Sequence, residues 1–234
     1  MRMTSSAAAL LLLMGTGVAL AGPVADFKAG MTEAYAAYRQ ALFTTNAGDP
    51  GKASAANQAF RDKWDALRAE WEKTPPPHLA DDPAFATTLD RVAGIASSAT
   101  GIIAEGNLPE AHEKLEAIRE EISALNERNG VVTFSDFMND YHAQMEHVIR
   151  RKYTSADGLD AVADAGVLEW LGNRLEHKAD AGQMGDPEFR KALAAVRQSI
   201  TTFMIAARSQ NAEAIHEAQA GLKKPYARLF LRWG

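Results

Sequence analysis

Thioether and imidazole side chains share one face of a predicted helix near residue 140. Met138, His142 and Met145 stand at positions i, i+4 and i+7, and this spacing aligns them along one side of an α-helix. Sulfur together with an imidazole nitrogen suits copper(I), and iron is the other metal that we consider. Methionines at this spacing beside aromatic residues are also typical of gap-filling core positions, so a packing interpretation stands beside the metal interpretation.

A fourth candidate ligand is His177, near the end of a helix predicted over residues 159–178. If that helix runs antiparallel to the one at 135–152, its end lies level with the start of the neighbour, and His177 could approach His142. A histidine at a helix C-terminus is also favoured by the backbone dipole. The candidate metal ligands are therefore Met138, His142, Met145 and His177.

Two further histidines form a repeated pair. His112 and His216 each lie in the second turn of a predicted helix and each precedes a glutamate. Glu213 and His216 have the Glu-x-x-His spacing of di-iron bundles, but such a site needs two of these motifs. Pro109 occupies the position in the first half that corresponds to Glu213, so the motif is not repeated and a di-iron site is not expected.

The helices that carry these residues belong to an internal repeat. The segment Asp82-Pro83-Ala84-Phe85 returns 104 positions later as Asp186-Pro187-Glu188-Phe189, and His112 meets His216 at the same offset. Met31 corresponds to Met138 at an offset of 107, which indicates a longer loop in the first half. A repeat of this length predicts two copies of one structural unit.

Apolar residues recur at spacings of three and four within each copy, which predicts four amphipathic helices per half. The first half is expected to hold helices over residues 27–42, 60–71, from Asp82-Pro83 onward, and 108–128. The second half is expected to hold helices at 135–152, at 159–178, from Asp186-Pro187 onward, and after Asn211 with a kink at Pro225. Short connections favour antiparallel neighbours, so the predicted fold is all-α, with two tandem up-down-up-down four-helix bundles at residues 22–130 and 131–234.

Residues 1–21 have the pattern of a secretory signal peptide. Arg2 precedes an apolar segment at residues 7–14, and Ala19-Leu20-Ala21 fits a cleavage site. We therefore expect export to the periplasm, with no membrane span in the mature chain.

Removing Arg2 changes the net charge from −5 to −6, which argues against nucleic acid as a partner. The absence of cysteine excludes disulfides and thiolate sites.

Two helix connections of the first half resemble those of soluble cytochrome b562. They are Glu72-Lys73-Thr74-Pro75-Pro76-Pro77-His78-Leu79, followed by Asp82-Pro83, and Ala104-Glu105-Gly106-Asn107-Leu108-Pro109-Glu110-Ala111. The resemblance implies a four-helix bundle in each half and a b-type haem bound through Met31 or Met138, at the position of the family's methionine ligand. The family's histidine ligand falls at Asn126 in the first half and at Phe230 in the second.

No motif of a known catalytic type is present: the sequence lacks Gly-x-Ser-x-Gly, a P-loop and His-Glu-x-x-His. Three hypotheses follow for the function. The chain is a non-catalytic binding protein for a copper or iron ion, a b-type haem protein that transfers electrons, or a haem-free structural module that binds an unidentified periplasmic protein.

Overall fold

The computed structural model describes residues 22–154 and 157–234. Over these two ranges the chain is helical and contains no β-strand, which confirms the all-α prediction. The predicted signal peptide at residues 1–21 lies outside the described residues. Across the described ranges, every helix is too short or too polar to cross a membrane.

The N-terminal helices are α1 (Pro23–Asn46), α2 (Pro50–Trp71), the 3-10 helix η1 (Pro77–Leu79), α3 (Phe85–Ala104) and α4 (Leu108–Arg128). The C-terminal helices are α5 (Phe134–Arg150), α6 (Gly158–Lys178), α7 (Ala181–Gly185), α8 (Pro187–Ser209), α9 (Ala212–Ala220) and α10 (Lys223–Trp233). The short helix α7 was not expected from the sequence. The 3-10 helix η1 was not expected either, and the other helices overlap the predicted ranges, although α2 begins at Pro50 and not near residue 60.

Side-chain caps set where several of these helices begin. Asp49 accepts a hydrogen bond from the Lys52 N–H at the start of α2, and Asn211 caps α9 through the Glu213 N–H. Asp186 accepts from the Glu188 N–H, so α8 begins at Pro187 as expected. The equivalent Asp82 instead closes a turn by accepting from the Ala84 N–H at 2.9 Å, and α3 begins later, at Phe85.

The last predicted helix is broken into α9 and α10 at Gly221 and Leu222. Proline has no N–H, and its ring clashes with the carbonyl four residues earlier, which for Pro225 is the carbonyl of Gly221. The break removes that clash because Pro225 then lies in the first turn of α10, where no N–H donor is needed. The predicted kink is thus a full interruption that begins four residues before the proline.

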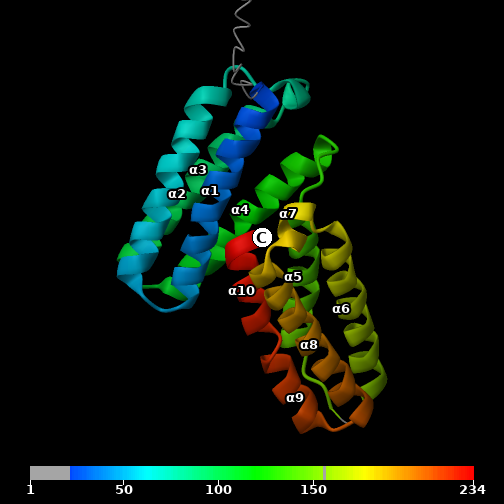
Figure 1. Cartoon of the computed structure of the whole chain (residues 1–234). Coiled ribbons are helices and arrows are strands. Elements are labelled where there is room, and N and C mark those ends of the chain that lie inside the picture. Colours follow the sequence, from blue (N-terminus) through cyan, green and yellow to red (C-terminus); the bar gives the residue numbers. More distant parts are fainter. Residues whose placement is uncertain (1–21, 155–156) are drawn as a thin grey trace, which may run out of the picture.

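The helices pack in two sets that meet along α10 (Figure 1). In the N-terminal set, α1 packs against α2 and α4, and α3 packs against α2 and α4. In the C-terminal set, α6 packs between α5 and α8, while α10 packs against α8 and α5. Because α10 also packs against α1, a single cluster of buried apolar side chains extends through both sets.

Two buried tyrosines fix the helices around this meeting point. The Tyr38 hydroxyl on α1 donates to the Leu115 carbonyl oxygen on α4 at 3.0 Å. The Tyr226 hydroxyl on α10 donates to the Met138 carbonyl oxygen on α5 at 3.3 Å. Each bond satisfies a hydroxyl that burial removes from water, so both contribute to the relative positions of α1, α4, α5 and α10.

Candidate functional site

A cavity of about 410 Å³ lies where α1, α4, α5 and α10 come together. Buried side chains form its floor, and exposed ones, including Phe43 and Lys224, form its rim. The lining residues that carry polar chemistry are Arg39, Asn46, His112, Glu116, Arg119, His142, Lys223, Lys224 and Tyr226. The volume falls in the range of small-molecule binding sites, and the mixed apolar and polar lining is typical of them.

Two charged residues of the lining, Arg39 and Arg119, are each only 8% exposed, and Arg119 is the one that contacts His142. Its Nη1 donates a hydrogen bond to Nδ1 of His142 at 2.5 Å, and its guanidinium lies 5.0 Å from the centre of the Phe230 ring. Within the described ranges no carboxylate approaches it within the 4.0 Å of an ion pair, and its Nε has no hydrogen-bond partner. A buried charge without a counter-charge is costly.

The contact with Arg119 fixes the protonation of His142. Because an arginine can only donate, Nδ1 of His142 accepts, and the ring proton of the neutral imidazole is on Nε2. Nε2 lies 3.7 Å from Oε1 of Glu116 and 3.8 Å from Oε1 of Glu146. Burial, together with the charge of Arg119, lowers the pKa of His142 to about 3, so the ring is neutral at physiological pH.

Glu116 is the one carboxylate among the residues that line the cavity. Burial alone would raise its pKa, but hydrogen bonding from His112 and the interactions with His142 and Arg119 outweigh burial and hold the pKa at about 2. The His112 Nε2 lies 3.5 Å from Oε1 of Glu116. The carboxylate is therefore ionised at neutral pH, although it is too far from Arg119 to form an ion pair with it.

Arg39 lines the cavity from α1 and links the two sets of helices. Its Nε donates to the Leu231 carbonyl oxygen at 3.1 Å and its Nη2 to the Arg232 carbonyl oxygen at 3.4 Å, and its Nη1 donates to an oxygen of Gly234. These oxygens lie at the C-terminal end of α10, where carbonyl groups lack partners within the helix. Arg39 therefore caps α10 from another helix.

The structure brings together two of the predicted metal ligands. His142 and Met145 both line the cavity. Met138 is fully buried but does not line it, and Met31 is partly buried at the edge of the core. His177 is exposed and donates from Nδ1 to the Asn173 carbonyl oxygen of its own helix at 2.7 Å. The predicted approach of His177 to His142 is not seen in the structure.

The geometry around His142 does not favour a bound cation. In the described part of the chain, no three histidine, aspartate or glutamate side chains converge closely enough to hold a metal ion. Since the Nδ1 of His142 accepts from Arg119, the Nε2 proton occupies the position from which the ring would bind a metal. The guanidinium of Arg119 and the Lys223 ammonium, 3.3 Å from Glu146, also repel cations.

A haem held in the manner of cytochrome b562 does not fit these residues. Asn126, at one family histidine position, donates its side-chain amide to Asp136 at 3.4 Å. Phe230, at the other, packs in a stack with Tyr226, with ring centres 5.7 Å apart. Neither side chain supplies an imidazole, and the methionine positions Met31 and Met138 lie outside the cavity lining.

The polar cavity residues that our sequence reasoning missed are Arg39, Asn46, Glu116, Arg119, Lys223, Lys224 and Tyr226. One signal was available for Arg119, which stands four positions after Leu115 and three before Ile122, both of which are buried. It therefore belongs to the apolar face of its helix, where an unpaired charge is rare. Its equivalent at the repeat offset is Lys223, on the rim of the same cavity.

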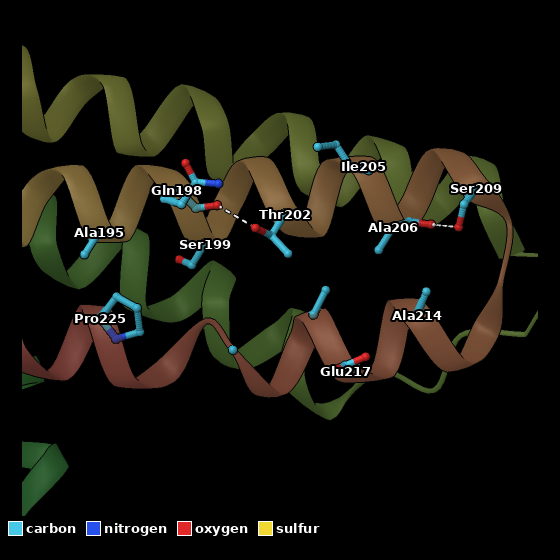
Figure 2. Close-up of a pocket in the computed structure, with 12 residues that line it drawn as sticks. Ala195, Gln198, Ser199, Thr202, Ile205, Ala206, Ser209, Ala214, Glu217 and Pro225 are labelled. Atoms are coloured by element: carbon cyan, nitrogen blue, oxygen red, sulfur yellow. Dashed lines mark hydrogen bonds between the residues drawn. The ribbon is translucent and has the colours of Figure 1, made fainter.

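A second hollow, of about 700 Å³, lies between α8 and the α9–α10 segment (Figure 2). Its lining is mostly small, with Ala206 on α8 facing Ala214 on α9 and Ala195 on α8 facing Pro225 on α10. The hydroxyls of Ser199, Thr202 and Ser209 each donate to a carbonyl oxygen of their own helix, so they are already partnered. This hollow lacks converging polar groups, and the cavity around Arg119 is therefore the better candidate site.

Comparison of the chain with protein-family models, with curated proteins and with solved structures gave no match.

Proposed function

We propose that this chain is a non-catalytic binding protein that holds a small molecule in the cavity between α1, α4, α5 and α10. The observation that carries the proposal is Arg119, a buried guanidinium that lines a cavity of about 410 Å³ and has no carboxylate partner among the described residues. Proteins tolerate such a cost where the group serves a ligand.

We also propose the fold arrangement and the cellular location that the sequence predicts. The helices form two tandem four-helix bundles resembling cytochrome b562, with α9 and α10 together acting as the last helix of the second bundle. The segment at residues 1–21 directs the chain to the periplasm. The repeat at an offset of 104 residues and the packing of the helices in two sets support the first point, and the Ala19-Leu20-Ala21 site supports the second.

A second candidate function is the binding of a copper or iron ion. The observation that favours it is that His142 and Met145 share the cavity with His112 and Glu116. Binding would require Arg119 to leave the Nδ1 of His142, because that hydrogen bond fixes the proton on Nε2. The electron-transfer hypothesis with b-type haem, and the hypothesis of a structural module with a protein partner, stay predictions.

The test is to purify the protein from its native compartment without denaturation and to analyse what it carries. We expect a small organic molecule in about equal amount to the protein, released on unfolding and identified by mass spectrometry. An absorption spectrum and elemental analysis of the same sample distinguish this result from haem or from a stoichiometric metal ion, either of which would contradict the proposal. The N-terminal sequence of the purified chain tests cleavage after Ala21.

A variant that fills the cavity tests whether the co-purified molecule binds there. Ala227 lines the cavity from α10, and Ala227→Trp should prevent the molecule from co-purifying. Ala104→Trp, at an exposed position that does not line the cavity, is the matched control and should retain it. Retention by both variants would place the ligand elsewhere and contradict the proposed site.

A further inference from the structure

We infer that the ligand of this cavity is an amphipathic organic anion, with a carboxylate head placed at Arg119 and an apolar body placed along α10. The inference rests on the proposed function and names the chemical class of its ligand. It depends on three properties of the lining: a buried arginine without an ion pair, an excess of cations, and an apolar floor.

Arg119 forms no ion pair within the described ranges, and the ionised Glu116 acts on its charge only from beyond contact distance. His142, its hydrogen-bond partner, is neutral, and Glu116 lies beyond ion-pair distance. Tyrosines also surround it, but burial raises the pKa of Tyr35 and of Tyr226, so neither supplies a phenolate. The Arg119 Nε remains a buried donor without an acceptor. A ligand oxygen with negative charge would provide both the missing acceptor and the missing counter-charge.

The wider lining carries more positive than negative charge. Arg39, Arg119, Lys223 and Lys224 line the cavity, whereas Glu116 is its one lining carboxylate. Glu146, which pairs with Lys223 at 3.3 Å, adds a second negative charge behind the lining. This local excess of cations stands out in a chain whose formal net charge is −5. It favours an anion over a cation in the cavity.

The lining between these charges is apolar, which distinguishes this cavity from a site for a free inorganic anion. The larger apolar side chains of the lining are Leu42, Phe43, Met145, Phe230 and Leu231, and the ring of Tyr226 extends the same surface. Leu42, Met145 and Phe230 are buried, so they can contact a ligand away from water. Lys223 and Lys224 lie at the exposed rim, where they can attract an anion as it enters.

The position of Arg119 determines the orientation of the ligand. Because the guanidinium lies over the Phe230 ring and is buried, a carboxylate that reaches it must pass the rim and enter the cavity. The apolar body would then lie along Phe230 and Leu231 toward the rim at Phe43. A neutral or cationic ligand of the same shape would leave the guanidinium unpaired and would bind more weakly.

The experiment is isothermal titration calorimetry of the full-length protein, after removal of any co-purified molecule, with octanoate, octylamine, octanol and acetate as probes. We expect octanoate to bind at one site, and the other three probes to bind at least about tenfold more weakly, equivalent to 1.4 kcal/mol. Arg119→Gln should weaken octanoate binding at least tenfold and bring its affinity close to that of octanol. Arg91→Gln, which removes an exposed arginine of α3, is the matched control and should bind octanoate as the wild type does.

The outcomes separate failure of the inference from failure of the proposed function. Binding of octanol or octylamine as tight as that of octanoate, abolished by Ala227→Trp, would overturn the anionic ligand but leave a binding cavity. Octanoate binding unaffected by Arg119→Gln would overturn the role of Arg119. If Arg119→Gln does not fold, Lys223→Gln at the rim replaces it, and an unchanged octanoate affinity in that variant at low salt would overturn the inference.

Discussion

Arg119 on α4 and His142 on α5 are joined by a hydrogen bond of 2.5 Å that links the N-terminal helices to the C-terminal helices. The bond assigns the His142 proton to Nε2 and keeps the ring neutral, so the guanidinium gains an acceptor without gaining a counter-charge. This relationship explains why a buried arginine can lie in the apolar face of α4 and still lack an ion pair. It also makes the cavity at this junction chemically different from a packing defect.

The buried charge of Arg119, which has no ion pair, should make the ligand-free protein less stable than a variant with an apolar side chain at this position. Arg119→Met keeps much of the apolar stem that packs on Phe230 and removes the charge. We expect this variant to raise the free energy of unfolding by roughly 1–3 kcal/mol, by analogy with the replacement of buried charged groups by apolar ones. Urea denaturation monitored by circular dichroism measures the change. A fall in stability would indicate that the charge is satisfied in a way that the structure does not show.

His142 should make the protein less stable in mild acid. Its folded-state pKa, about 3, lies below its ordinary value, so between pH 6.5 and pH 3 the unfolded chain binds more protons than the folded chain. Stability should therefore fall as the pH is lowered through this window, by about 1.4 kcal/mol per pH unit at most from this residue. The charged groups that face the ring are Arg119, Glu116, Glu146 and Lys223.

Denaturation curves at pH 6.5, 5.5 and 5.0 isolate this contribution, because the carboxyl groups are still largely ionised there. His142→Gln should show a shallower loss of stability than the wild type. His177→Gln, at an exposed position on α6, is the control and should keep the wild-type slope. If the free energy of unfolding depends on pH equally in all three proteins, His142 titrates alike in the folded and unfolded chains, which would contradict this prediction.

Arg39 should contribute to stability through the end of α10. Arg39→Met leaves the oxygens of Leu231, Arg232 and Gly234 without this donor and removes these hydrogen bonds between α1 and the end of α10. We expect a loss of about 1–2 kcal/mol, since one buried and two partly buried acceptors would lose their donor. Amide hydrogen exchange gives a sharper measurement, because protection should decrease first at residues 229–233. Unchanged protection in α10 would show that the helix end is held by packing alone.

Removal of metal ions should leave ligand binding unchanged. The residues around His142 do not converge on a metal ion in the described ranges, and the proposed ligand contacts need none. Dialysis against a strong chelator should therefore alter the octanoate affinity by less than about twofold, a change of 0.4 kcal/mol. Loss of binding after chelation, restored by copper or iron, would favour the metal hypothesis and the ligand set of His142 and Met145.

Helix positions were largely predictable from the sequence, because apolar spacing, the Asp186-Pro187 start and the Asn211 cap are local signals. Asp82-Pro83 instead forms a turn, so the start of α3 was predicted too early. The interruption at Gly221 was predicted only as a kink, since Pro225 marks the cause and not the residue where the chain bends. The site was much less predictable. His142 and Met145 were identified from their spacing on one helix, whereas Glu116 and Lys223 reach the same cavity from α4 and α10 through contacts between distant parts of the chain.

The most direct test of the central claim is to observe the Arg119 side chain by NMR while the ligand is added. The Nε–H of Arg119 is buried and has no acceptor, so its 15N-correlated signal reports on this group alone once Arg119→Lys has assigned it. We predict that octanoate shifts this signal and slows its exchange with water at one equivalent, with smaller shifts for the amides of α10. An unchanged Arg119 signal at saturating octanoate, or shifts confined to the hollow between α8 and α9, would contradict the assignment of the cavity as an anion-binding site.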